Sequence, residues 1–167
     1  MAIRAPELLT SHHNISNFNC GVQDLDHWLK KRSIKSQAQN NTKVYVVTDS
    51  DTEQVVGYYA IAMGSVQRES AIGSFRRNSP NPIPILVLAR LGVHIQYQRH
   101  AIGAGLLKDC ILRAVKAMNI VGGAGILVHA IDDSAKDFYK KFGFTESPID
   151  SMTLMARIVD IEAGLSI

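Results

Sequence analysis

The residues Gln96-Tyr97-Gln98-Arg99-His100 join an apolar run, residues 91–95, to a segment with helical periodicity, residues 101–118. A strand that turns directly into a helix presents unpaired backbone N–H groups at the positive end of the helix dipole, where phosphate groups bind. Gly103 leaves room for close approach of a phosphate, and Arg99 adds a positive charge. We interpret this junction as a candidate pyrophosphate site, and an ordinary helix start is the alternative.

A second cluster of side chains is basic and lies near the N-terminus. Leu25, Trp28, Leu29 and Ile34 recur at helical spacing, which predicts one helix of about 14 residues with an apolar stripe. Its other face carries the cations Lys30, Lys31, Arg32 and Lys35. A solvated face, with the long stems covering apolar surface, explains any one of them, whereas the group as a whole also favours phosphate binding.

The elements that position these groups follow in the order strand, strand, strand, helix, strand, helix, strand after the basic helix. A polar loop separates the first two strands, so we expect an antiparallel hairpin. Asp132 and Asp133 are candidate caps for the last helix. The predicted strands are residues 43–48, 55–63, 85–95, 126–131 and 152–158, and the predicted helices after the basic one are residues 101–118 and 132–140.

Residues 65–84 interrupt this regular order. The segment contains Arg68, Arg76 and Arg77 and then three prolines within five residues. Prolines at this density oppose regular structure, so we expect a long surface loop. Such a loop either contacts a substrate or is disordered.

Composition limits the class of protein. With 167 residues and 46% hydrophobic content, the chain predicts a single domain, residues 1–167, with one core. No apolar run approaches the roughly 20 residues of a membrane span, and no secretion signal opens the chain, which predicts a cytoplasmic protein. Cys20 and Cys110 form no Cys-x-x-Cys pair, so reduced thiols are expected. The histidines show no metal-ligand spacing, and we expect no metal.

Two motifs resemble a known family. Gln98-Arg99-His100-Ala101-Ile102-Gly103 resembles the Q/R-x-x-G-x-G/A acetyl-CoA motif of the GNAT superfamily, with Ala101 where the family usually has its first glycine. Asp132-Asp133-Ser134-Ala135-Lys136-Asp137-Phe138-Tyr139-Lys140-Lys141-Phe142-Gly143-Phe144 resembles the family's N-x-x-A-x-x-F-Y-x-x-x-G-F helix and turn, with Asp132 for asparagine. The resemblance implies an α/β (α+β) fold, the GNAT acyl-CoA N-acyltransferase fold, in which helices flank a mixed central β-sheet.

The resemblance also implies roles for individual residues. Tyr139 would protonate the departing thiolate of coenzyme A, and a phenol is suitable because its reference pKa is near 10. Val93 would contact the pantetheine amides at the strand edge. The remaining residues expected at the acetyl-CoA co-substrate are Gln98, Arg99, His100, Ala101, Ile102, Gly103, Ala104 and Ser134.

Further matches are similar to the GNAT toxins of bacterial type II toxin–antitoxin modules: Asn19-Cys20-Gly21, Leu25-Asp26-His27-Trp28-Leu29-Lys30, Phe75-Arg76-Arg77-Asn78, Pro82-Ile83-Pro84 and Leu127-Val128-His129-Ala130. The resemblance implies acetylation of the α-amino group of aminoacyl-tRNA, which blocks translation. It also implies a homodimer, a ribbon-helix-helix antitoxin, and operator DNA bound only through the antitoxin complex.

The tRNA would need an electropositive surface. Arg90 lies in an apolar strand, where either a structural ion pair or a substrate contact would explain it. The residues expected to bind tRNA are Lys30, Lys31, Arg32, Lys35, Arg76, Arg77 and Arg90.

The sequence contains no unmistakable general base. His94 and His129 are candidates near the thioester, although packing or hydrogen bonding is the more usual role of such histidines. A free α-amino group has a pKa of about 8, and esterification lowers it, so part of the amine is already neutral at cellular pH. Two alternatives stay open: a GNAT enzyme that acetylates a small amine or a protein N-terminus, and an interaction module that holds an antitoxin on DNA.

Overall fold

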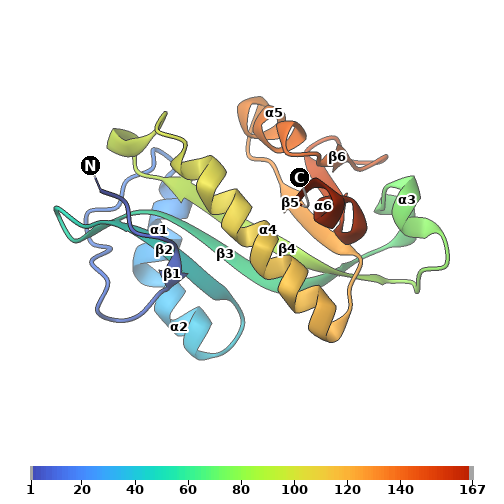
Figure 1. Ribbon diagram of the computed structural model, residues 1–167, viewed down its shortest axis with the longest axis horizontal. Helices are drawn as coiled ribbons and strands as arrows, with labels where there is room; N and C mark the ends of the chain where they lie inside the picture. The colour runs from blue at the N-terminus through green and yellow to red at the C-terminus, as the bar shows by residue number, and fades with distance from the viewer. Residues whose placement is uncertain (1, 166–167) are drawn as a thin grey trace. The chain divides into compact units, whose positions relative to one another are not determined.

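The order of strands and helices in the computed structural model, which describes residues 2–165, follows the sequence prediction closely (Figure 1). Seven strands are hydrogen-bonded in the order β1-β2-β3-β4-β5-β7-β6. The β4–β5 pair is parallel, and the β1–β2, β2–β3, β5–β7 and β6–β7 pairs are antiparallel. The predicted mixed sheet with helices is therefore confirmed.

Contacts within the chain group its residues into two compact units. The first unit is Met1–Ala62 with Ala89–Cys110, and the second is Met63–Leu88 with Ile111–Ile167. The strands β3 (Gln54–Val66) and β4 (Ile83–Val93) contribute residues to both. The expectation of a single domain stays a prediction.

The first unit is built on the predicted hairpin. The strands β2 (Lys43–Asp49) and β3 pair antiparallel, and the short strand β1 (Glu7–Leu8), which the sequence did not indicate, adds to the outer side of β2. Alternate residues of β2 and β3 enter a core that also receives Phe18 and Leu29. This core fixes the helices that carry the basic residues.

The predicted 14-residue basic helix is wrong, because two helices replace it. They are α1 (Gln23–Lys31) and α2 (Ser33–Ala38), separated by Arg32, whose φ of −124° is not helical. The buried Ser33 hydroxyl donates a hydrogen bond to the Leu29 carbonyl oxygen. A serine that bonds back to the preceding turn bends a helix, so the stripe of apolar residues does not continue to Ile34, which is exposed.

The second unit contains the last strands and helices. The strand β5 (Gly125–His129) pairs in parallel with the Leu86–Leu88 part of β4 and antiparallel with β7 (Thr153–Arg157). Asp132 caps α5 as predicted, because its carboxylate accepts a hydrogen bond from the Ala135 amide at 2.8 Å. The remaining elements are α5 (Asp133–Lys141), β6 (Thr145–Glu146) and α6 (Ile158–Leu165).

Residues 65–84 are more ordered than a surface loop. The segment contains the end of β3, the turn η1 (Arg68–Ser70) and the helix α3 (Gly73–Arg76). Phe75 is buried in a cluster with Ile83, Ile85, Leu127 and Met155. The prediction of a loop throughout is therefore wrong, because apolar side chains before, between and after the prolines anchor the segment.

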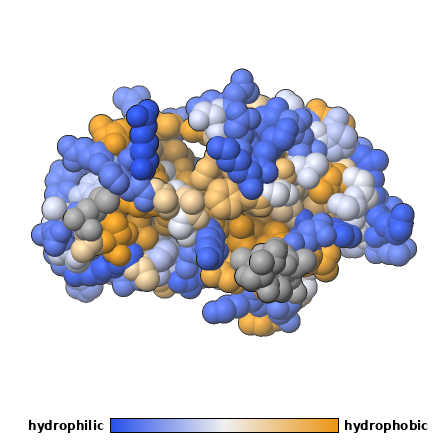
Figure 2. Space-filling model, turned by 45° about the horizontal axis from the view of Figure 1, so that its top comes forward, coloured by the Kyte–Doolittle hydropathy of each residue, from blue (hydrophilic) through white to orange (hydrophobic). Residues whose placement is uncertain are grey.

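The 20-residue helix α4 (Ile102–Val121) follows the short turn η2 (Ile95–Tyr97). Cys20 and Cys110 are both buried, and neither forms a disulfide. Hydrophilic side chains cover much of the face seen in Figure 2, with apolar ones exposed between them. Within residues 2–165, no helix combines the length and the apolar character that crossing a bilayer requires.

Candidate cofactor and substrate site

The junction between β4 and α4, in the first unit, has the backbone conformation expected of a phosphate-binding turn. Arg99 has φ 68° and Ala101 has φ 62°, so both residues have a left-handed backbone conformation although neither is glycine. The amide of Gly105 bonds to the Ala101 carbonyl, so α4 begins immediately after this turn. The N–H groups of the first turn of α4 have no carbonyl partner within the helix, so they are available to bind a ligand.

The side chains of the junction hold its backbone in place. The side-chain nitrogen Nε2 of Gln98 donates to the Val93 carbonyl oxygen at 2.9 Å and to the Cys20 carbonyl oxygen at 3.1 Å. The Tyr97 hydroxyl donates to Asp49 Oδ2 at 2.6 Å. This bond holds the pKa of the Asp49 carboxyl below its usual value and raises the pKa of the Tyr97 phenol. The turn is therefore tied at both ends to β4 and β2.

The other predicted acetyl-CoA residues of this unit lie on the same segment. Val93 is the last residue of β4. Arg99 and His100 are exposed, and Gly103 and Ala104 are half-buried in the first turn of α4. Ile102 differs, because its side chain is in the core and only its backbone remains for a ligand. The structure thus brings these residues together, mainly as a run of backbone groups.

Tyr139 and Ser134 lie on α5, in the second unit. Tyr139 is 6% exposed, and its ring packs edge-on against Phe144 at 5.8 Å between centroids and against Phe138 at 5.2 Å. Ser134 is exposed in the first turn of α5, next to the capping Asp132. The aromatic packing fixes the orientation of the Tyr139 ring, as a positioned proton donor requires.

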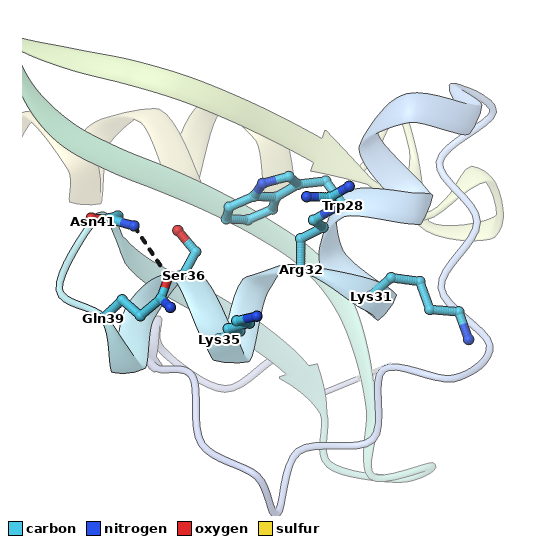
Figure 3. Close-up of a pocket in the computed structure, with 7 residues that line it drawn as sticks. All are labelled: Trp28, Lys31, Arg32, Lys35, Ser36, Gln39 and Asn41. Carbon is cyan, nitrogen blue, oxygen red and sulfur yellow. Dashed lines mark hydrogen bonds between the residues drawn. The ribbon is translucent and has the colours of Figure 1, made fainter.

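Three basic residues of the first unit line a cavity of about 320 Å³ formed by α1, α2 and the following loop (Figure 3). Lys31, Arg32 and Lys35 supply its charge, and Trp28 supplies an aromatic wall. Lys30 is outside it and lines a neighbouring cavity with Lys31. The pocket is completed by Ser36, Gln39 and Asn41.

Arg90 contacts Trp28, which lines this pocket, and the sequence did not predict this contact. Its guanidinium carbon lies 4.5 Å from the centroid of the Trp28 ring, and Trp28 stacks on Tyr58 at 6.2 Å. Such a cation–π contact is favourable when partly desolvated. Arg90 Nε is buried without a hydrogen-bond partner among the described residues. The contact with Trp28 accounts for an arginine in an apolar strand without an ion pair.

Arg76 and Arg77 belong to the second unit and differ in what they touch. The Arg76 guanidinium donates to the backbone carbonyl oxygens of Ala71 and Glu69, so it braces the turn before α3. Arg77 lines a cavity of about 400 Å³ together with Arg157 and Asn78. Arg77 is thus the better placed of the two to meet an anionic ligand.

Sequence reasoning missed contacts between residues that are distant along the chain. Tyr97 and Asp49 are one case, and a hydrogen-bonded chain of His129, Thr153 and Asp150 is another. The local signal was a threonine at the start of β7, directly before three apolar residues. Among the described residues, no group of three His, Cys, Asp or Glu side chains is placed to hold a metal ion.

Comparisons with known proteins agree with this geometry. The model of the family described as Acetyltransferase (GNAT) domain matches residues 40–146. The chain is 38% identical over 159 residues to the tRNA-acetylating toxin of Mycobacterium tuberculosis, covering 95% of each protein. These matches confirm the resemblance proposed from the two motifs.

Solved structures of the toxin AtaT share the fold. One, in complex with acetyl-methionyl-tRNAfMet, has a TM-score of 0.89 at 24% identity and covers 98% of this chain and 99% of that one. Another, a mutant bound to the C-terminus of the antitoxin AtaR, has a TM-score of 0.84 at 23% identity and covers 100% of both chains. The family model and the mycobacterial relative together show that this chain belongs to the GNAT acetyltransferases.

Proposed function

We propose that this protein transfers the acetyl group of acetyl-CoA to the α-amino group of aminoacyl-tRNA and thereby blocks translation. The observation that carries the proposal is the left-handed turn at Ala101, which opens α4 in a chain 38% identical to a tRNA-acetylating toxin. A turn of this kind directs successive amides toward one anion, as the pyrophosphate of acetyl-CoA requires.

Acetyl-CoA is assigned to the residues that the motifs select. The backbone from Gln98 to Ala104 would hold the pyrophosphate, Val93 would meet the pantetheine amides, and Ser134 would contribute from α5. Tyr139 would protonate the sulfur as the carbon–sulfur bond breaks. The buried, aromatic surroundings of Tyr139 support this role, because they limit access of water as an alternative acid.

The tRNA is assigned to the basic surface of α1 and α2. Lys31, Arg32 and Lys35 share one pocket wide enough for a phosphate group, and Lys30 extends the charge to the neighbouring cavity. Arg90 supports the Trp28 wall of that pocket. In the second unit, Arg77 is assigned to tRNA binding. Arg76 is assigned a structural role, because it holds the backbone of the segment that carries Arg77.

The first test measures transfer of radiolabelled acetyl from acetyl-CoA to bulk charged tRNA, with uncharged tRNA as control. We expect label on charged tRNA only, and loss of transfer in Tyr139→Phe with binding of acetyl-CoA retained. Label on small amines or protein N-termini but not on charged tRNA would favour the alternative enzyme. Toxicity that survives Tyr139→Phe would favour the interaction module.

The tRNA surface is tested by charge reversal at Lys31 and Lys35. We expect Lys31→Glu with Lys35→Glu to raise KM for charged tRNA and to reduce its salt dependence, because fewer counterions are released on binding. The affinity for acetyl-CoA should not change. Lys108→Glu with Lys116→Glu, on the exposed side of α4, is the matched control and should leave KM near the wild-type value. Equal effects of the two pairs would contradict the assignment.

The proposed partners are a ribbon-helix-helix antitoxin and a second copy of the chain, with operator DNA bound through the antitoxin complex. The AtaT structure with the C-terminus of AtaR supports an antitoxin partner. Action on tRNA places the protein in the cytoplasm. Co-expression with a small ribbon-helix-helix gene found beside this one should relieve toxicity, and toxicity that persists would argue against that partner.

A further inference from the structure

We infer that His129 is the general base of the reaction, and that Thr153 and Asp150 are positioning residues that fix its tautomer. The inference rests on the proposed acetylation of aminoacyl-tRNA. It begins from a continuous chain of hydrogen bonds in the second unit. His129 Nδ1 and Thr153 Oγ1 are 2.8 Å apart, and Thr153 Oγ1 donates to Asp150 Oδ2 at 2.8 Å.

The direction of this chain determines which nitrogen of the imidazole carries the proton. A carboxylate only accepts hydrogen bonds, so the single hydroxyl proton of Thr153 is directed to Asp150. Thr153 Oγ1 must then accept from His129, which places the imidazole proton on Nδ1. In the neutral ring the lone pair is therefore on Nε2, the nitrogen that a base would use.

The Asp150 carboxylate is held in its charged form. It accepts hydrogen bonds from the Thr153 hydroxyl and from the Met152 amide, and these bonds lower the pKa of the carboxyl below its usual value. An ionised Asp150 at neutral pH keeps the Thr153 proton pointing away from His129.

The location of His129 suits contact with a substrate. It is the last residue of β5, directly after Val128, which ends the parallel pairing with β4. Ligands of α/β sheets bind beyond the carboxyl ends of parallel strands. His129 is the only exposed residue of β5, whereas Thr153 behind it is buried. Among residues 2–165, no hydrogen bond involves His129 Nε2, which leaves this nitrogen available to a substrate.

The chemistry balances with His129 and Tyr139 in separate roles. His129 Nε2 takes one proton from the α-ammonium, and the freed nitrogen forms a bond to the thioester carbonyl carbon. The tetrahedral intermediate loses its second ammonium proton to water, and the carbon–sulfur bond breaks with its electron pair on sulfur. Tyr139 donates a proton to that sulfur, and both side chains regain their starting states by exchange with water, with one net proton released.

The proton transfer is well matched in energy. Imidazole has a reference pKa of about 6.5 and an α-amino group about 8, lowered further by the ester. A base whose pKa lies near that of the group it deprotonates works efficiently around neutral pH. This match distinguishes His129 from a carboxylate, which would be too weak a base.

The first experiment examines the tautomer in the protein without substrate. Long-range proton–nitrogen NMR of the imidazole rings should show Nδ1 protonated and Nε2 unprotonated in wild type and in Thr153→Ser, which keeps the hydroxyl. Thr153→Val has nearly the same shape without the hydroxyl and should lose this preference. A His129 ring protonated on Nε2 in wild type would overturn the inference.

The second experiment measures turnover on charged tRNA. We expect His129→Ala to lower kcat by about 10²-fold or more, with acetyl-CoA affinity and melting temperature near wild type, and added imidazole to restore part of the rate. Thr153→Val should be slow and Thr153→Ser nearly normal. An unchanged kcat in His129→Ala would overturn the inference. It would also be overturned if added imidazole fails to rescue His129→Ala and the kcat of Thr153→Val equals that of Thr153→Ser. Absence of transfer by wild type would instead contradict the proposed function.

Discussion

Replacing Ala101 by glycine should stabilise the protein, although glycine usually destabilises. At φ 62°, the Cβ of Ala101 crowds the backbone, and a residue other than glycine pays about 1–2 kcal/mol in this region. Glycine removes that cost but gives the unfolded chain more freedom, which costs about 0.5–1 kcal/mol. The expected net change is a gain of about 0–1.5 kcal/mol, the difference between these two terms.

Ala117, inside α4 about one turn before the helix ends, provides the matched control. Ala117→Gly makes the same chemical change in a regular helix, where it should cost about 1 kcal/mol. Because the unfolded-state cost is the same in both variants, the difference between them reports the backbone strain at Ala101. At this chain length, a difference of about 1–2 kcal/mol separates the two melting temperatures by about 2–8 °C.

Thermal unfolding followed by circular dichroism measures this difference directly. Ala101→Gly should also bind acetyl-CoA in a calorimetric titration, because the substitution retains every backbone amide of the turn. Equal melting temperatures for Ala101→Gly and Ala117→Gly would refute the argument that Ala101 is strained. Loss of acetyl-CoA binding in a stable Ala101→Gly protein would show that the methyl group itself contacts the ligand.

Three further predictions follow from other contacts. Gly125→Ala should lower stability by about 1–3 kcal/mol or more, measured by denaturant unfolding, because a Cβ at Gly125 would lie 2.0 Å from the Ala156 carbonyl oxygen. Tyr97→Phe should weaken acetyl-CoA binding several-fold and leave kcat at saturation unchanged, since it removes only the bond to Asp49 that ties the turn; an unchanged affinity would contradict this role. Hydrogen bonds from two lysines lower the pKa of Glu146 in the folded protein. The carboxylate therefore contributes its full stabilisation of the folded state above the ordinary pKa, and this contribution is lost as pH falls through the lowered pKa. Urea unfolding should therefore show Glu146→Gln less stable than wild type at pH 7, and the difference should shrink as pH falls below the ordinary carboxyl pKa.

Local sequence signals predicted the elements whose boundaries depend on nearby residues. Asp132 caps α5, and the polar residues between β2 and β3 give the expected hairpin. The break at Arg32 was missed because the apolar spacing continues through Ile34. Periodicity records which residues are apolar, whereas the bend depends on whether the buried Ser33 hydroxyl bonds to the Leu29 carbonyl.

The proposed catalytic residues show a second limit of prediction from sequence. Tyr139 could be chosen from its motif, but no motif identifies a histidine whose partners lie 21 and 24 residues further along the chain. His129, Thr153 and Asp150 meet only because β5 and β7 pair with His129 opposite Thr153. A register shift of one residue would turn the Thr153 side chain to the other face of the sheet. Strand register, which sequence patterns specify weakly here, therefore decides whether His129 can serve as a base.

The proposed acetyl-CoA junction suggests how a glycine motif can function with alanine at its centre. Backbone amides would bind the phosphate there, so the side chains of the same residues are free to hold the backbone. The Gln98 amide group bonds to Val93 and Cys20, and Tyr97 bonds to Asp49. These bonds keep the chain in a conformation that Ala101 alone would not choose. The motif thus specifies a backbone shape, and glycine is one way to reach it, whereas here distant hydrogen bonds supply the missing preference.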